Sequence, residues 1–436
     1  MHPVSLRRFD WWRVHLLGVV FVAAGPTIAS PGQTEPVPAA AAVSASASPQ
    51  VLELSWPDVV RLAEAHPRLA ADQLQVAAAR RGIDAAGAVP NPTFEADLGR
   101  GRARIGDESR TESELALSIP FGWIAQRRSR LEAANAEVDL ALAESRSSRR
   151  EVVLQLGTLF WGLAYEQARV GVLETLVAQT SKLAQTVRRR VETGEVRPVE
   201  APLVEIELEK VAGDLEAART LLLARQTALA RWLAVPPGQT LVANADLSAL
   251  PVVLDREAAL ARARSADPAL IIVSARSRVL AADVKTERRA PIPSFSLRGF
   301  ATDELDRRAY GVGVSVDIPV WNWNRARIAQ AEAKLAAGSR QAEAAALEVE
   351  TTVIEAQAAC SASVATAKRF RDAIVPRSET AAFTMERTYQ LGEASLLPVI
   401  DARRTLLDSR RLYLSALAQA QLDCSRLNAL AGEELP

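Results

Sequence analysis

The sequence predicts an α+β fold built from two β-hairpins and two very long helical hairpins. Three observations support this prediction. The chain of 436 residues repeats itself with an offset of about 200 residues, it contains short segments in which apolar and polar residues alternate, and it contains long Ala- and Leu-rich segments without proline. Alternation with a period of two is typical of strands, whereas long proline-free segments of good helix formers are typical of helices.

The duplication is carried by four landmarks that occur twice in the same order. Residues 60–69 parallel 260–269, 90–94 parallel 291–295, 118–121 parallel 317–320, and 193–195 parallel 391–393. Because a fixed offset between similar segments indicates repeated structural units, the chain divides into two repeats and a connector. We place the first repeat at 52–234, the connector at 235–254 and the second repeat at 255–432.

The N-terminal segment 1–29 has the pattern of a secretory signal peptide. Arg7, Arg8 and Arg13 precede a short apolar core, and small residues follow at a cleavage site near Ala29. The core has 11 residues, from 14 to 24, and is too short for a membrane anchor that must span roughly 30 Å of hydrocarbon. We therefore expect export. Residues 30–51 are rich in Pro, Ala and Ser and predict a flexible linker.

Four strands are predicted, two in each repeat. Residues 114–119 and 310–318 alternate between apolar and small or polar side chains, and their partner strands begin at Phe94 and Phe295. A strand with one apolar and one polar face suits a membrane barrel. The alternative is a soluble hairpin with one wet face, but two hairpins are few for an independent soluble sheet. Four strands cannot close a barrel, so the membrane interpretation requires several chains.

The way in which the chain would cross a membrane follows from its hydropathy. No segment after the signal region offers 18 consecutive apolar residues, and only helices and closed barrels satisfy their backbone in lipid. Crossing would therefore be made by a barrel. Trp123, Trp321 and Trp323 come just after the second strand of each hairpin, where an aromatic belt at the lipid headgroups would lie.

Long helices account for most of the remaining chain. The predicted helical segments are 56–88, 124–190, 199–234, 256–289, 325–375 and 397–431. Roughly 65 residues at a rise of 1.5 Å reach about 100 Å, far beyond a helix of a globular domain. In each repeat a Gly-Glu turn joins two of these helices into a hairpin. Pro376 lies inside the second hairpin, so we expect a kink or break there.

The two cysteines are placed symmetrically in the second helical hairpin. Cys360 lies 32 residues before Gly392 and Cys424 lies 32 residues after it, so equal rise puts them at the same height, roughly 48 Å from the turn. Export would expose both thiols to an oxidising compartment. Three outcomes stay open: a disulfide, facing thiols without a bond, or two small buried side chains in an Ala-rich seam.

Short motifs in this duplicated frame resemble those of the outer-membrane factor (TolC) family, in its heavy-metal-efflux branch of CzcC- and CusC-like members. They include Leu117-Ser118-Ile119-Pro120, Ile318-Pro319-Val320-Trp321 and Tyr389-Gln390-Leu391-Gly392-Glu393. The resemblance covers essentially the whole mature chain. It implies a trimeric 12-stranded β-barrel, with four strands from each chain, continued by a long α-helical coiled-coil periplasmic tunnel.

The resemblance also implies a function and a location. It implies the outer-membrane exit duct of a tripartite efflux pump, through which small solutes or metal cations pass passively from the periplasm to the exterior. Its partners would be two further copies in a homotrimer, outer-membrane lipid, a periplasmic adaptor (membrane fusion protein) and an inner-membrane pump of the resistance-nodulation-division type. The adaptor would dock on the turns at Gly194, Glu195, Gly392 and Glu393. The alternatives are a type I protein-secretion duct and, in a different class, a periplasmic coiled-coil scaffold.

Carried over residue by residue, the resemblance places a periplasmic gate just past the two turns. Glu200, Tyr389 and Asp401 match the acids and the tyrosine that hold the closed end of such tunnels. The sequence departs from the family at Ala394 and Pro398, where an Arg and an Asp are usual. The alternative is that Glu200 and Asp401 are ordinary acids in the first turn of a helix, where they favour the helix dipole.

The residue types that enzymes and metal sites need are scarce. His66 is the only histidine after the signal region, and the two methionines are Met1 and Met385, so neither a zinc-type nor a Met-based copper site is expected. No phosphate-binding loop or nucleophile elbow occurs. The 52 basic and 52 acidic residues are interspersed, which argues against nucleic-acid binding. We expect no enzyme, cofactor or metal site.

Overall fold

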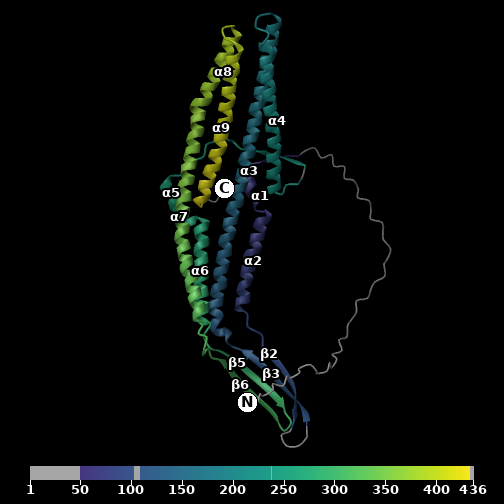
Figure 1. Ribbon diagram of the computed structural model, residues 1–436, viewed down its shortest axis with the longest axis vertical. Coiled ribbons are helices and arrows are strands. Elements are labelled where there is room, and N and C mark those ends of the chain that lie inside the picture. Colours follow the sequence, from purple (N-terminus) through teal and green to yellow (C-terminus); the bar gives the residue numbers. More distant parts are fainter. Residues whose placement is uncertain (1–49, 103–108, 237, 433–436) are drawn as a thin grey trace, which may run out of the picture. The chain divides into compact units, whose positions relative to one another are not determined.

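The computed structural model describes residues 50–102, 109–236 and 238–432 (Figure 1). The predicted signal peptide 1–29 and all but the last two residues of the predicted linker 30–51 lie outside this range. Those last two residues belong to a strand, β1 (Gln50–Leu54), so the predicted linker is wrong at its C-terminal end. None of the helices in the described part of the chain is both long and apolar enough to cross a membrane.

Each repeat begins with two short helices, where the sequence predicted one. The first repeat has α1 (Trp56–Ala63) and α2 (Pro67–Gly87), and the second has α5 (Arg256–Ala266) and α6 (Pro268–Arg289). The prediction of single helices over 56–88 and 256–289 is wrong because each contains a proline that can only begin a helix. His66 and Asp267 cap the new helices by accepting backbone N–H groups at 3.2 and 2.7 Å.

The four predicted strands form one antiparallel sheet in the order β2-β3-β5-β6. The strands are β2 (Thr93–Arg102), β3 (Ser109–Pro120), β5 (Ser294–Asp303) and β6 (Arg308–Asp317). They lie side by side in Figure 1, with β2 and β6 as the two outer strands. An edge of each outer strand is therefore unpaired, and one chain closes no barrel.

The register gives this sheet two chemically different faces. Val314 lies opposite Leu297, which in turn lies opposite Ile119, whereas Ser315 lies opposite Ser296. The same pairing places eleven large side chains, all exposed, on one face: Phe94, Leu98, Leu115, Leu117, Ile119, Phe295, Leu297, Tyr310, Val312, Val314 and Val316. The other face carries acids, serines and glycines, two arginines (Arg110 and Arg298) and a single large aromatic side chain, Phe300.

A second, smaller sheet was not predicted. β1 pairs in parallel with β4 (Gln239–Ala243), which lies within the segment 235–254 that we took as a plain connector. Leu54 and Leu241 from these strands are buried in the largest apolar cluster, together with Phe160. The small sheet thus joins the first described residues to the junction between the two repeats.

Both predicted helical hairpins are formed, and the helices predicted at 124–190, 199–234 and 397–431 are shifted by one or two residues at each end. The helix predicted at 325–375 ends six residues earlier, at Arg369. The first joins α3 (Trp123–Glu192) to α4 (Glu200–Trp232). The 70 residues of α3 span about 105 Å at 1.5 Å per residue. The apolar seam predicted inside α3 is buried, with exposed fractions of 0, 0, 8 and 0% at Val152, Leu156, Leu159 and Leu163.

The second hairpin is irregular in its first arm. α7 (Arg325–Arg369) passes into a five-residue π-helix, Phe370–Ile374, before α8 (Val375–Gln390) and the returning α9 (Leu396–Leu430). The break expected at Pro376 is therefore a π-turn immediately before the proline, which removes one helical N–H donor. Figure 1 shows α8 and α9 running side by side, as α3 and α4 do.

Candidate functional site

The two turns at the tips of the helical hairpins are built in the same way. Gly194 and Gly392 adopt positive φ angles of 75° and 79°, a conformation that glycine adopts without steric cost. In each turn the N–H of the next residue bonds to a carbonyl five residues back, from Glu195 to Arg190 at 2.8 Å and from Glu393 to Thr388 at 3.0 Å. This is the Schellman pattern that ends a helix, and it leaves all four predicted docking residues exposed.

Next to the turns, a buried hydrogen bond links the two hairpins. The hydroxyl of Tyr389, on α8, donates to Oε2 of Glu200, the first residue of α4, at 3.1 Å. Tyr389 is 2% exposed and Glu200 is 5% exposed. Burial and then the charge of Glu200 raise the pKa of Tyr389 to about 12. The hydroxyl therefore stays protonated and remains a donor throughout the physiological range.

Arg190 makes a second connection between the same hairpins. From the end of α3, its Nη1 donates to the backbone carbonyl of Tyr389 at 3.0 Å. Its guanidinium also lies 5.2 Å from the centroid of the Tyr389 ring, within cation–π range. Nε of Arg190 bonds to Glu195 at 3.1 Å. One arginine thus joins its own turn to the facing hairpin.

The sequence analysis missed Arg190, although a signal for it exists. Gly194 and Gly392 are 198 residues apart, so Arg190 corresponds to Thr388 in the second repeat. A charged residue that breaks the duplication beside a turn is a candidate for a contact between repeats. Its partner is a backbone carbonyl, however, and no side-chain pattern reveals such an acceptor.

A further ionic contact between hairpins lies about two helical turns from Glu200. Nε of Arg404, on α9, donates to Oε1 of Glu207, on α4, at 2.9 Å, and its Nη2 contacts the other carboxylate oxygen. The two-point contact is a fork that suits arginine and carboxylate. Below the tip, the apolar side chains of Val187, Val204, Val399 and Ile400 fill the space between the hairpins.

Asp401, the third predicted gate residue, does not join this cluster. Its carboxylate is 64% exposed, and the charged group facing it is Arg404 at 3.9 Å. The structure therefore brings Glu200 and Tyr389 together and leaves Asp401 at the surface, because Asp401 falls on a different side of α9 from the buried Ile400. A gate role for Asp401 stays a prediction that needs more than one chain.

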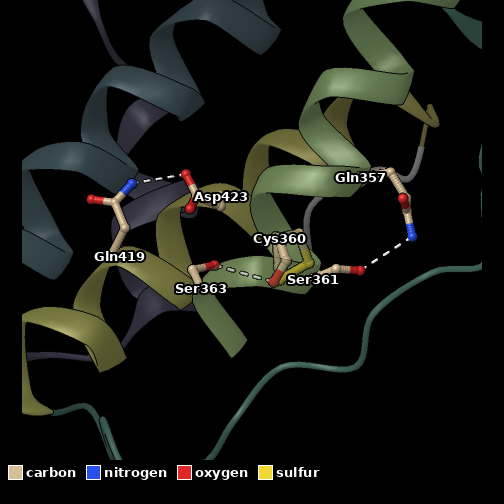
Figure 2. The surroundings of a disulfide bond; sticks show 7 residues. Gln357, Cys360, Ser361, Ser363, Gln419 and Asp423 are labelled. Atoms are coloured by element: carbon tan, nitrogen blue, oxygen red, sulfur yellow. Dashed lines mark hydrogen bonds between the residues drawn. A yellow bond between two sulfur atoms is a disulfide. The ribbon is translucent and has the colours of Figure 1, made fainter. Parts of the chain in front are cut away.

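The two cysteines lie face to face between the arms of the second hairpin. Cys360 on α7 and Cys424 on α9 form a disulfide, with Cα atoms 4.8 Å apart. Figure 2 shows the bond with Gln357, Ser361 and Ser363 around it. Both cysteines are buried, at 0 and 1% exposed, in an apolar cluster of the two helices. Of the three outcomes left open by the sequence, the structure has the first.

The polar face of the four-stranded sheet concentrates acids around one arginine. Nη2 of Arg298, on β5, lies 2.8 Å from Glu114 and 3.5 Å from Glu95. Asp97 and Glu112 lie on the same face. This cluster is solvent-accessible, and within the described ranges no group of three or more His, Cys, Asp or Glu side chains has the arrangement of a metal site.

This combination of a two-faced sheet and long helical hairpins with interlocked tips defines a class of channel proteins. The chain belongs to the outer membrane efflux protein family, which matches residues 59–235 and 259–433. The two matched segments begin and end within seven residues of the bounds that we place for the two repeats, 52–234 and 255–432.

Individual relatives agree with this assignment. The cobalt-zinc-cadmium resistance protein CzcC of Cupriavidus metallidurans is 24% identical over 356 residues, 80% of this chain and 83% of CzcC. The solved structure of CusC has a TM-score of 0.72 at 17% identity, and covers 88% of this chain and 93% of CusC. The open-state channel MtrE of Neisseria gonorrhoeae has a TM-score of 0.70 at 18% identity, with 87% and 89% coverage.

The predicted family, fold class, channel function and outer-membrane location are therefore confirmed. The structure adds that the barrel is not closed within one chain. Members of the family are channels rather than enzymes. The alternative of a periplasmic scaffold that never enters a membrane is wrong, because the sheet and the helices together are those of outer-membrane efflux channels.

Proposed function

We propose that three copies of this chain form the exit duct of a tripartite pump that expels metal cations. Two unpaired strand edges and a continuous exposed apolar face support closure by neighbouring copies. Three chains of four strands make a 12-stranded barrel whose apolar face meets lipid and whose polar face lines the lumen. The long helices continue this duct into the periplasm.

Metal cations are the proposed cargo for two reasons. One relative that covers most of the chain is named as a cobalt-zinc-cadmium resistance protein. The polar face of the sheet also carries four acids, Glu95, Asp97, Glu112 and Glu114, against Arg298 in the same cluster. Repeated around a lumen, such acids would favour cations over anions. The duct would therefore supply charge and shape, and the pump would select the metal.

The proposed partners are a periplasmic adaptor, bound at the exposed turns, and an inner-membrane pump of the resistance-nodulation-division type. Gly194 and Gly392 expose backbone at the tips, and Glu393 adds a carboxylate with no ion pair in the described part of the chain. The first tip lies at the far end of α3 from the sheet, since this 70-residue helix begins at Trp123 beside the sheet and ends at Glu192 beside the turn. An adaptor at this position would reach the contacts that hold the two hairpins together.

The described conformation would be the closed state, and the observation that carries this proposal is the Tyr389–Glu200 hydrogen bond. It is buried, it joins the two hairpins, and Arg190 reinforces it. Separation of the hairpins at the tips must break both contacts. Opening by the adaptor would then replace contacts within the chain by contacts to the partner.

The experiment combines assembly, conductance and metal tolerance. The purified chain should crosslink as a trimer and show low conductance in planar bilayers, and Tyr389→Phe with Glu200→Gln should raise it. Cells that lack the gene should lose tolerance to zinc, cobalt or cadmium and regain it with the wild-type gene. A chain that stays monomeric both in detergent and in the membrane would contradict the proposal. So would cells that keep their metal tolerance without the gene, and in which the gene restores the export of proteins instead.

A further inference from the structure

The junction between the sheet and the long helices carries an excess of positive charge. Residues 121–132, 284–293 and 318–332 contain eight basic and three acidic side chains, a net charge of +5 (8 − 3), in a chain whose formal net charge is zero. These segments are the start of α3, the end of α6 and the start of α7. The first meets the sheet through the N–H of Phe121, which bonds to the carbonyl of Phe295 at 2.8 Å. The second leads directly into β5 and the third follows directly on β6.

Most of this charge is not neutralised within the chain. Three of the eight basic side chains form ion pairs, with two acids between them: Arg128 and Lys285 both contact Glu132, and Arg288 contacts Glu332. Among the described residues, five arginines at the junction have no carboxylate at ion-pair distance, and we call them the basic collar: Arg127, Arg130, Arg289, Arg325 and Arg327. Arg130 in addition keeps a buried Nε without a hydrogen-bond partner.

The basic collar adjoins the apolar face of the sheet and the tryptophans predicted to form a belt. After β6 the chain runs through Ile318 and Val320, 69 and 60% exposed, to Trp321 and Trp323, 95 and 55% exposed. Arg325 and Arg327 follow directly and are exposed. Along this stretch the surface changes from apolar to aromatic to cationic within ten residues, which is the order of layers from hydrocarbon to headgroup phosphate.

The backbone that leads into Arg325 and Arg327 is anchored on the neighbouring helix. Asn324 has a positive φ of 59°, and its side-chain amide donates to the carbonyl and the carboxylate of Glu287 at 2.8 and 2.7 Å. This anchors the first turn of α7 on the end of α6. On α3, an open groove combines apolar walls with two guanidinium groups and one carboxylate, and is lined by Trp123, Ile124, Arg127, Arg128, Leu131, Glu132 and Asn135.

We propose that the basic collar binds the phosphate groups of anionic phospholipids in the periplasmic leaflet of the outer membrane. The apolar face sets where the hydrocarbon ends, and the collar lies on the side of the helices, which is periplasmic. Guanidinium groups bind phosphate oxygens through two parallel N–H donors. An anionic headgroup supplies the negative charge that the chain itself lacks here. The collar thereby fixes the depth of the channel in the membrane.

The test measures lipid preference by tryptophan quenching. The trimer is reconstituted in phosphatidylcholine vesicles that contain either brominated phosphatidylglycerol or brominated phosphatidylcholine. The wild-type protein should bind the anionic lipid several-fold more tightly. Each arginine near an anionic surface contributes about fivefold, equivalent to about 1 kcal/mol. Arg325→Gln with Arg327→Gln should remove most of the preference, and Arg325→Lys with Arg327→Lys should retain it.

Matched controls separate the collar from net charge and from assembly. Arg377→Gln with Arg387→Gln makes the same charge change on exposed arginines of α8, far from the sheet, and should leave the preference intact. If the first pair of variants fails to assemble, Arg127→Gln with Arg289→Gln tests the same claim. An unchanged preference in assembled collar variants would overturn the proposal. So would equal competition by millimolar inorganic phosphate, which would indicate a site for free anions.

Discussion

Arg190 at the end of the first long helix donates a hydrogen bond to the backbone carbonyl of Tyr389 in the second hairpin, at 3.0 Å. Because Tyr389 itself donates to Glu200, the two hairpins are linked in both directions by one small cluster. The contact depends on a departure from the internal duplication, since Thr388 occupies the matching position of the second repeat. The contacts between the two tips are therefore asymmetric between the repeats.

Replacement of Arg190 by Met should loosen the tips. It removes a charge-assisted hydrogen bond worth about 1.5–3 kcal/mol, which corresponds to roughly 10- to 100-fold in the equilibrium between open and closed states. Arg190→Lys should be intermediate, because an ammonium keeps the charge but not the fork. Single-channel recording gives the open probability. Arg189→Met, an exposed neighbour without an ion pair in the described chain, is the control, and an equal effect there would contradict the assignment.

The hydroxyl of Tyr389 should be insensitive to pH over the physiological range. Its pKa is raised to about 12 in the folded protein from about 10 in the unfolded chain. The stabilisation is therefore fully present below about pH 10 and is lost as pH rises through about 12. Ultraviolet difference titration of the wild type against Tyr389→Phe reports this ionisation. A midpoint near 10 would show that the Tyr389 hydroxyl is not buried beside Glu200 in the folded protein.

Glu200 and Asp401 should respond differently to neutralisation. Glu200→Gln weakens the buried bond to Tyr389 and should raise the open probability. Asp401 is exposed, so Asp401→Asn should leave closure unchanged. Because a trimer repeats each acid three times around the opening, Asp401→Asn should lower cation preference and block by multivalent cations. Reversal potentials in salt gradients measure the preference, and unchanged values for Asp401→Asn would make this exposed acid an ordinary surface residue.

The elements that sequence patterns predicted well are those with a strong local period. The alternation in β6 and the apolar seam of α3 each repeat many times, so their positions could be read within one to three residues. The breaks at Pro67 and Pro268 were missed, although proline and a capping residue mark them locally. The pairing of β1 with β4 could not be predicted, because it joins Gln50 to Gln239, which are far apart in the sequence.

The candidate site was predictable in part for a related reason. Glu200 and Tyr389 were found by position relative to the turns, and the structure brings them together. Asp401 was placed by the same argument, but it is exposed, whereas Ile400, the residue before it, is buried, because neighbouring residues point to different sides of a helix. Rotation about the helix axis is set by packing between hairpins, and sequence spacing alone does not fix it. Arg190 was missed because its acceptor is a backbone carbonyl.

The two faces of the sheet give a prediction about insertion. Val314 lies on the face with the exposed large apolar side chains, and Ser315 lies on the polar face. Arginine on the lipid face near the bilayer midplane costs about 2–4 kcal/mol, whereas arginine in the lumen costs little. Val314→Arg should therefore reduce the amount of trimer in outer-membrane fractions more than Ser315→Arg. Equal amounts of trimer would contradict the assignment of the faces.

The disulfide leads to the last prediction, which concerns where the second hairpin can move. Cys360 and Cys424 correspond to Gly162 and Gln226 in the first repeat, by the same offset of 198 residues, so only the second hairpin has this link within the described chain. The π-helix Phe370–Ile374 lies between Cys360 and the tip. The bond therefore fixes the arms below an irregular segment, and movement of the tip should be confined to the part above it.

This prediction is tested first by counting thiols and then by removing the bond. Denatured, unreduced protein should contain no alkylatable thiol, and reduction should release two per chain. The native protein should resist reduction, because both sulfurs belong to buried residues. The chain-entropy model gives about 4 kcal/mol for a cross-link that spans 64 residues, so Cys360→Ala with Cys424→Ala should lower the thermal stability of the helical part.

Spin labels on the tip should show the same closed distance in the wild type and in this double variant. In the wild type the part of the hairpin that moves should end above the disulfide, whereas in the variant it should extend farther from the tip. Two free thiols in the mature protein would contradict this role. So would identical motion of the arms below the π-helix with and without the bond, because a cross-link restricts how far the two arms can separate where it joins them.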